Sequence, residues 1–192
     1  MNSRMASLPH KHLITVDDYY RMAEVGLLAP DARVELIEGE IIDMAPIGID
    51  HGRAVDILNR LFVRAVGDQA IVRVQGAVRL NLRSEPQPDL ALLAPSADDY
   101  GSRQPAPADV LLLIEVSDST LRYDMDVKLP LYARHGIPET WIVDLRGGEL
   151  KRYRVPRDGR YLELDTSSKP GIARVAALPE IGIDLTRLFP SS

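Results

Sequence analysis

The chain has 192 residues, of which 45% are hydrophobic and 27% are charged; this mixture excludes a disordered protein, and no apolar run approaches the ~18 residues of a membrane span. It contains no cysteine, which excludes disulfides and thiolate sites, so any metal needs oxygen or imidazole ligands, a condition that favours Mg²⁺ or Mn²⁺. The formal net charge of −5 argues against a broad basic surface that coats nucleic acid, but it leaves a local basic groove open.

The length and the absence of repeats predict one domain over residues 13–190. Residues 1–12 contain basic side chains but lack the continuous apolar stretch of a secretory signal. We therefore expect a flexible N-terminal segment there and a cytoplasmic protein.

A helix and a hairpin open the predicted fold. The helix covers residues 17–24, with Thr15 as its N-cap. Residues 34–37 and 40–44 flank a tight turn in which Gly39 supplies a positive φ, so they are expected to pair as two strands.

The middle of the chain predicts one long helix and the centre of a sheet. Apolar residues recur at helical spacing over residues 50–67, with His51 in the first turn. Residues 71–82 alternate between apolar and polar, which is typical of a half-buried strand. Residues 89–94 and 110–116 are nearly continuous apolar runs and are expected to be central strands covered on both faces.

The last third continues the sheet. A helix is expected between residues 116 and 141, followed by a strand at residues 140–145. Two turn sequences then predict hairpin strands at residues 150–155 and 161–165. A short helix over residues 184–189 is expected to close the chain.

Two carboxylates stand where the central strands open to solvent. Asp89 follows Pro88 at the entry of one strand, and Glu115 lies near the exit of the next. A carboxylate beside an apolar strand is costly unless it is paired, hydrogen-bonded or bound to a cation, and neither strand contains Lys or Arg. A bound metal would remove this cost. The alternative is that Asp89 caps a turn and Glu115 pairs with an arginine such as Arg122.

A set of motifs from Tyr20 to Phe189 extends this pattern. In chain order the set comprises residues 34–40 (VELIEGE), His51, Pro88-Asp89, residues 114–120 (IEVSDST), Asp124, Lys128, Tyr132 and residues 136–144 (GIPETWIVD). With these motifs the sequence resembles the Uma family of restriction-endonuclease-like proteins, a branch of the PD-(D/E)xK nuclease superfamily.

The resemblance implies an α/β (α+β) fold with a restriction-endonuclease-like core, in which helices flank a central mixed β-sheet with added β-hairpins. It also implies a Mg²⁺-dependent site for phosphodiester hydrolysis. The catalytic residues carried over are Glu35, Asp89, Glu115 and Lys128.

The chemistry suggests a role for each of these residues. Asp89, Glu115 and the carbonyl of Val116 would suffice as metal ligands, because Mg²⁺ keeps several waters. Lys128 would orient or help deprotonate the attacking water, or stabilise charge on the phosphate. Glu35 would complete an outer shell of the metal or bind it through water.

Two positions depart from the superfamily pattern. Ser117 stands where the signature lysine is expected, and the family pattern moves that lysine to the next helix, where Lys128 matches. Pro130 would kink this helix and could misplace Lys128. Ser117 is expected to cap a turn. His51 is expected either to contact a substrate phosphate or to position Glu35, unless it is a solvated first-turn residue.

These features together predict a metal-dependent endonuclease that hydrolyses phosphodiester bonds in DNA. A homodimer is expected, because two-fold related sites suit cleavage of both strands of a duplex. The alternative is a catalytically weak or inactive nuclease-fold module that binds nucleic acid or regulates a partner. Ser117, Pro130 and the acidic balance motivate that alternative.

Overall fold

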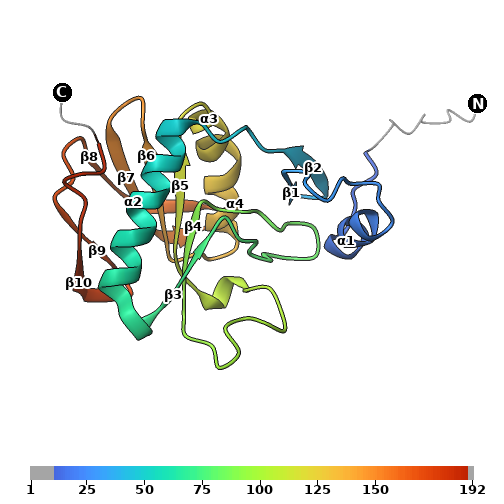
Figure 1. Cartoon of the computed structure of the whole chain (residues 1–192), viewed down its shortest axis with the longest axis horizontal. Coiled ribbons are helices and arrows are strands. Elements are labelled where there is room, and N and C mark those ends of the chain that lie inside the picture. Colours follow the sequence, from blue (N-terminus) through green and yellow to red (C-terminus); the bar gives the residue numbers. More distant parts are fainter. Residues whose placement is uncertain (1–10, 190–192) are drawn as a thin grey trace, which may run out of the picture.

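A six-stranded sheet forms the centre of the computed structural model, which describes residues 11–189 (Figure 1). Its strands, in spatial order, are β3 (Ile71–Val74), β4 (Leu90–Leu93), β5 (Val110–Ser117), β6 (Glu139–Asp144), β7 (Glu149–Arg157) and β8 (Arg160–Ser167). β5 and β6 run parallel, and the other neighbours are antiparallel. The predicted mixed sheet is confirmed. The expected flexible segment falls mostly on residues 1–10, which lie outside the described residues.

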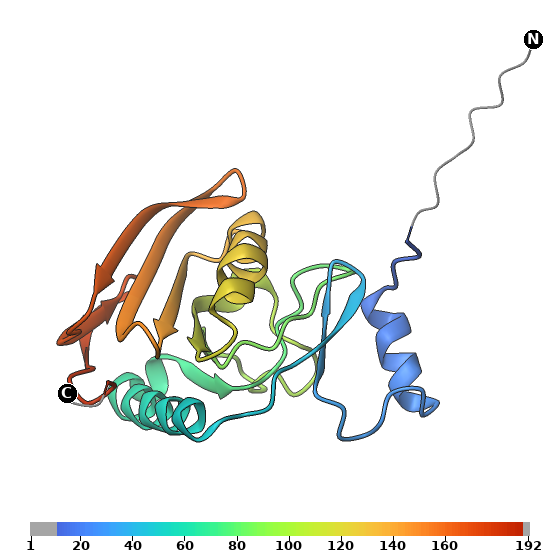
Figure 2. The same cartoon turned by 90° about the horizontal axis from the view of Figure 1, so that it is seen from above.

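Helices cover both faces of this sheet (Figure 2). α2 (Ile49–Val66) lies on one face. The opposite face carries α3 (Leu121–Tyr123), a π-helical segment (Asp124–Lys128) and α4 (Leu129–Arg134). The sheet is therefore covered on both sides, which explains the continuous apolar runs of β4 and β5.

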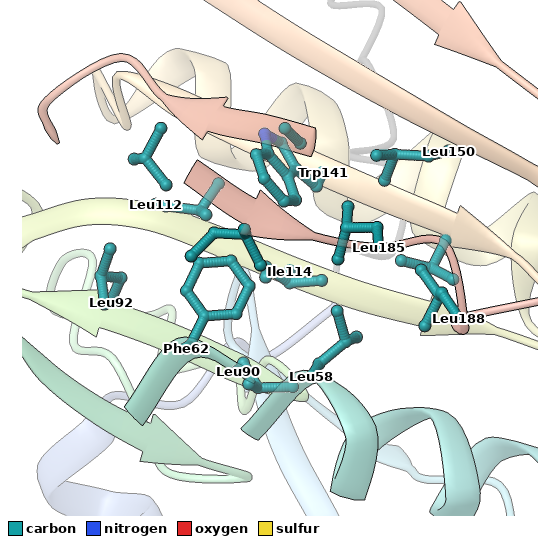
Figure 3. Close-up of a cluster of buried hydrophobic side chains, with 14 of the residues drawn as sticks. Leu58, Phe62, Leu90, Leu92, Leu112, Ile114, Trp141, Leu150, Leu185 and Leu188 are labelled. Carbon is teal, nitrogen blue, oxygen red and sulfur yellow. The ribbon is translucent and has the colours of Figure 1, made fainter. Parts of the chain in front are cut away.

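Alternating side chains of the central strands fill two separate cores. Leu90, Leu92, Leu112 and Ile114 point toward α2 and pack with Phe62 and Trp141 (Figure 3). Ala91, Leu93 and Leu113 point the other way, toward Leu131 and Tyr132 of α4. This alternation decides on which face each polar residue of the same strands emerges.

The N-terminal elements stand at one end of the sheet (Figure 2). α1 (Val16–Glu24) is capped by Thr15 and Asp18, which form a reciprocal capping box. β1 (Val34–Ile37) pairs with β2 (Glu40–Asp43) through a turn in which Glu38 and Gly39 both have positive φ. The predicted helix and hairpin are confirmed.

Two predicted elements are wrong. Only the first four residues of the strand expected over 71–82 are extended, because Gln75 adopts a left-handed φ of 48° and ends the pairing with β4. No helix covers residues 184–189; the chain there leaves β10 (Leu178–Asp184), which pairs with β9 (Ile172–Val175) in a hairpin that packs beside α2. The sequence analysis had not anticipated this hairpin.

Within residues 11–189, no helix has both the length and the apolar character needed to cross a membrane.

The packing of α2 predicts a sharp contrast between two positions of that helix. Leu58 is fully buried against the sheet, whereas Val63 is 52% exposed. Leu58→Ala should lower the free energy of unfolding by about 2–5 kcal/mol, because it leaves a cavity in a dense core. Val63→Ala, the control, should change it by about 0.5 kcal/mol or less. Urea denaturation followed by circular dichroism measures both, and equal losses would contradict this packing.

Candidate active site

The register of β4 and β5 brings Asp89 and Glu115 together. Leu90 pairs with Ile114, so one residue further along this antiparallel ladder Asp89 stands opposite Glu115. Both follow the alternation of Ala91 and Leu113 and therefore emerge on the α4 face. The two acids that are 26 positions apart in the sequence become direct neighbours across the sheet.

The backbone of Val116 faces the same place. Its N–H donates to Asp89 Oδ2 over 2.8 Å. The carbonyl of the next residue, Ser117, accepts from Leu145 on the β6 side. Because the N–H and C=O of one strand residue point to the same edge, the Val116 carbonyl also faces Asp89.

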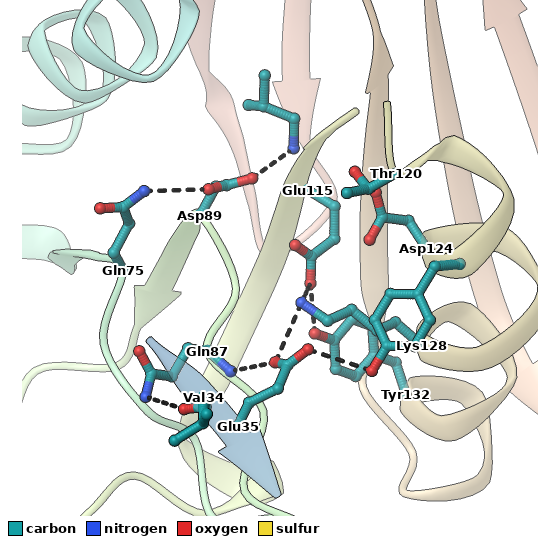
Figure 4. Close-up of polar contacts among 12 residues, drawn as sticks. Val34, Glu35, Gln75, Gln87, Asp89, Glu115, Thr120, Asp124, Lys128 and Tyr132 are labelled. Atoms are coloured by element: carbon teal, nitrogen blue, oxygen red, sulfur yellow. Dashed lines mark hydrogen bonds and ion pairs between the residues drawn. The ribbon is translucent and has the colours of Figure 1, made fainter. Parts of the chain in front are cut away.

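Lys128 supplies the cation at this site. Its Nζ lies 3.2 Å from Glu35 Oε2 and 3.2 Å from Glu115 Oε1, and its side chain is only 5% exposed (Figure 4). The alternative that Glu115 pairs with Arg122 is wrong, because Arg122 contacts Asp126 on the surface. The ammonium therefore bridges a carboxylate from β1 and a carboxylate from β5.

The helix that carries Lys128 is widened where a kink was expected. The N–H of Leu129 reaches back to the carbonyl of Asp124, one residue further than in an α-helix, and Pro130 follows in the first turn of α4. Proline has no N–H to donate, and a π turn absorbs such a break without ending the helix. Pro130 does not displace Lys128 from the two acids.

Glu35 and Glu115 are each held by further donors. Tyr132 Oη donates to Glu115 Oε1 at 2.5 Å, and Tyr123 Oη donates to Glu35 Oε1 at 3.2 Å. The backbone N–H of Gln87 also donates to Glu35, at 3.0 Å. Tyr132, one of the family motif residues, is fully buried, and its hydroxyl fixes the orientation of Glu115.

His51 contacts Asp89 rather than Glu35. Its Nε2 lies 3.1 Å from the Asp89 carboxylate, which also accepts a long bond from Gln75 Nε2 at 3.4 Å. The Nδ1 atom of His51 is buried and has no partner among the described residues. The hydrogen bond to Asp89 raises the pKa of His51, and partial burial opposes this shift.

Ser117 contacts a carboxylate of the helical segment that follows β5. Its fully buried hydroxyl donates to Asp124 Oδ2 at 2.8 Å, and Thr120 Oγ1 donates to the same oxygen at 2.7 Å. Asp124 is 4% exposed and borders the same pocket as Lys128. Ser117 thus orients Asp124 and leaves the place of the superfamily lysine without a cation.

Glu35, His51, Asp89, Glu115, Asp124 and Lys128 line one pocket of about 340 Å³ between the β1–β2 hairpin, the start of α2 and the helical segment after β5, and Ser117 and Tyr132 lie behind them. Its carboxylates are Glu35, Asp43, Asp89, Glu115, Asp118 and Asp124, and its basic residues are Arg33, His51 and Lys128. The pocket therefore holds an excess of negative charge.

Burial and crowding of like charges shift the protonation of the site. Burial raises the pKa of Glu115 well above its ordinary value; Lys128 opposes this shift, and the neighbouring acids increase it. Burial lowers the pKa of Lys128, but Glu115 and Glu35 outweigh it, and the pKa of Lys128 rises above its ordinary value. Lys128 is therefore an ammonium at neutral pH.

The sequence analysis had assigned no role to three polar residues of this pocket, Gln87, Tyr123 and Asp124. Asp124 stands four positions before Lys128, the spacing that puts two residues on one helical face. That spacing is a signal that could have identified Asp124. Gln87 acts through its backbone, which no side-chain pattern reveals.

Comparison with known proteins identifies the family of this chain. The model of the Uma2 family, described as "Putative restriction endonuclease", matches residues 16–186. The chain belongs to the Uma2 family. The resemblance inferred from the sequence motifs is thereby confirmed.

A solved relative shares the fold of this Uma2 protein. It is a crystal structure of "a putative nuclease belonging to DUF820 from Anabaena variabilis ATCC 29413", with a TM-score of 0.69 and 17% sequence identity. The match covers 92% of this chain and 97% of that chain, and at this identity it concerns the fold alone. The search of curated proteins found no match.

The donor set fits a divalent cation of the Mg²⁺ type. Asp89, Glu115 and the Val116 carbonyl offer hard oxygen atoms in a pocket with excess negative charge. Among residues 11–189, no three His, Asp or Glu side chains form a ready-made metal cluster. A Mg²⁺ ion that keeps most of its waters needs only one or two carboxylates, so this donor set is adequate.

The buried position of Lys128 predicts a pH-dependent loss of stability in a variant. Lys128→Met removes the charge that lowers the pKa of Glu115, so folding then favours the protonated carboxyl more strongly. A raised folded pKa means that stability falls as the pH rises, so the deficit of Lys128→Met relative to the wild type should grow as the pH rises through the folded pKa of Glu115 and reach about 3–5 kcal/mol once the wild-type Glu115 is ionised. Urea unfolding with EDTA at several pH values measures it.

Two controls accompany this variant. Lys151→Met removes a more exposed lysine from Asp144 and Glu149, and its cost should be smaller and change less with pH. Adding Glu115→Gln to Lys128→Met should flatten the pH dependence. A deficit that is constant with pH in the single variant would contradict the coupling of Lys128 to Glu115.

Proposed function

We propose that this Uma2 protein is a Mg²⁺- or Mn²⁺-dependent endonuclease that hydrolyses phosphodiester bonds in DNA. The observation that carries the proposal is the position of Asp89 beside β5, where it accepts from the N–H of Val116 and adjoins Glu115, whose carboxylate contacts the ammonium of Lys128. Membership of a family described as restriction endonucleases supports a nuclease activity.

In this proposal, Asp89, Glu115 and the Val116 carbonyl hold the cation. When bound, the cation supplies Lewis acidity toward the scissile phosphate. Lys128 stabilises negative charge that develops on the phosphate oxygens or orients the attacking water, and its raised pKa supports an electrostatic role over that of a base. Glu35 holds Lys128 in place.

Three side chains position these groups without contacting the phosphate. Tyr132 restrains Glu115, and Tyr123 restrains Glu35. His51 restrains Asp89 with its Nε2–H, so that the carboxylate keeps its orientation toward Glu115. Ser117 acts at one remove, through Asp124.

The competing proposal is a catalytically weak module that binds nucleic acid without cleaving it. Two observations favour it: Lys128 already neutralises Glu115, and no cluster of three ligand side chains exists among the described residues.

A homodimer belongs to the endonuclease proposal, because two-fold related sites cut both strands of a duplex. Light scattering of the purified protein would measure its mass.

Removal of either proposed metal ligand should abolish cleavage. Asp89→Asn and Glu115→Gln should each reduce the rate of plasmid nicking in Mg²⁺ or Mn²⁺ by about a hundredfold or more while the protein stays folded by circular dichroism. The control is Glu139→Gln. Glu139 is a carboxylate as buried as Glu115, but it lies at the start of β6, outside the pocket, so this variant should leave cleavage intact. Full activity in either ligand variant would refute the site, and an inactive wild type that binds DNA would favour the module.

His51 provides a test of the metal site that does not depend on turnover. His51→Gln should weaken Mn²⁺ binding by about 10–100-fold, the usual effect of losing a residue that orients a metal ligand. Isothermal titration calorimetry measures this affinity. His135→Gln is the control, because that histidine contacts Leu131 and Asn81 outside the pocket. Unchanged affinity in His51→Gln would remove His51 from the metal site.

A further inference from the structure

The exposed side of α2 differs in charge from the pocket beside it. The helix buries Ala54, Val55, Leu58, Phe62 and Val66. Its opposite side exposes Ile49, Arg53, Asp56, Arg60, Val63 and Arg64, which fall within an arc of about 100° at 3.6 residues per turn. We call Arg53, Arg60 and Arg64 the α2 basic stripe.

The arginines of the α2 basic stripe have no acidic partners. Within residues 11–189, none of the three forms an ion pair; Arg53 makes only long bonds to the backbone carbonyls of Arg187 and Leu188. Elsewhere in the described residues, eight arginines lie within ion-pair distance of a carboxylate: Arg79, Arg103, Arg122, Arg134, Arg146, Arg152, Arg154 and Arg157. Seven further arginines of this part of the chain form no ion pair, but they are spread over separate strands, loops and α1, whereas the three of the stripe share one side of one helix. The exposed charged residues of α2 are these three arginines and two aspartates, Asp50 and Asp56, so the exposed surface of the helix has one net positive charge in a chain whose net charge is −5.

Repulsion within the stripe is not offset by packing. Arg60 and Arg64 are four residues apart on the helix and repel each other, and Asp56, four residues before Arg60, offsets only part of their positive charge. Neither is buried, so neither contributes to the core. An anionic ligand would turn this repulsion into an attraction.

The position of the stripe connects it to the pocket. The pocket is lined by Gly48, the N-cap of α2, and by His51, in its first turn. From there the helix runs across the face of the sheet (Figure 1). Arg53 and Arg64 are 11 residues apart, or about 16 Å along the helix axis. The pocket itself is acidic, so attraction of a polyanion has to come from groups outside it.

We propose that the α2 basic stripe contacts phosphates of the DNA strand that flank the scissile bond. This inference rests on the proposed nuclease function and adds the surface along which the duplex lies. The guanidinium groups of the stripe displace counterions condensed on the DNA phosphates. They set how strongly the protein binds DNA and take no part in the hydrolysis itself.

The test is the salt dependence of binding to a fluorescently labelled duplex of about 30 base pairs, measured by anisotropy in EDTA. Arg60→Gln/Arg64→Gln should weaken binding by roughly tenfold at low salt and reduce the slope of log K against log salt by about 2, near 0.9 for each lost phosphate contact. In Mg²⁺ the same variant should raise KM for this duplex and leave kcat within about twofold.

The matched control is Arg134→Gln/Arg157→Gln, which lowers the net charge by the same amount on residues already paired with Glu38 and Asp158. It should bind DNA with the wild-type slope. An equal loss of DNA affinity in both double variants would mean that the effect comes from net charge alone, and it would overturn the inference. So would an unchanged slope in Arg60→Gln/Arg64→Gln, or a change in its mass by light scattering, which would make the stripe a contact between two copies.

These outcomes separate the inference from the function beneath it. If the wild type cleaves DNA and the Arg60→Gln/Arg64→Gln variant binds it with the wild-type slope of log K against log salt, the proposed role of the α2 basic stripe is wrong and the endonuclease proposal is unaffected. Wild-type protein that neither binds nor cleaves the duplex overturns both.

Discussion

One buried ammonium group holds the pocket together. Lys128 lies between Glu35 and Glu115, which come from a hairpin at the end of the molecule and from the centre of the sheet. Moving such charges out of water costs several kcal/mol for each ion, and this is offset only when all partners keep their geometry. The three segments are therefore tied to one arrangement, and the positions of Asp89, Asp124 and the two tyrosines depend on it.

The same arrangement divides the electrostatic tasks of the protein between two surfaces. A pocket rich in carboxylates attracts a cation and repels a phosphate backbone, whereas the exposed side of α2 carries three arginines that form no ion pair within residues 11–189. An acidic protein can then bind a polyanion locally, because screening confines each surface to its own neighbourhood at physiological salt. The overall charge of −5 describes neither surface.

The fold could be predicted where apolar residues form a clear pattern along the chain. The prediction failed where the local backbone conformation departed from what the residue types favour. The nearly continuous apolar runs of β4 and β5 and the amphipathic spacing of α2 identified the layers, because burial of apolar side chains follows the geometry of each element. The strand expected over 71–82 failed at Gln75, whose left-handed backbone is not a preference of glutamine. The helix expected over 184–189 failed because Asp184 still pairs with Ile172, the N–H of Leu185 bonds to the carbonyl of Gly171, and a single turn closed by Leu188 follows.

The sequence by itself determined the candidate side chains of the site: Asp89 and Glu115 at the ends of apolar strands, Lys128 after them and the motifs of the Uma2 family around them. Only the tertiary structure decided their partners. The register of β4 and β5 set Asp89 against Glu115, the π turn before Pro130 directed Lys128 to Glu35, and His51 met Asp89 instead of Glu35. Residue types and spacing fix local geometry, but contacts between distant segments depend on how the layers pack, which no short stretch of sequence encodes.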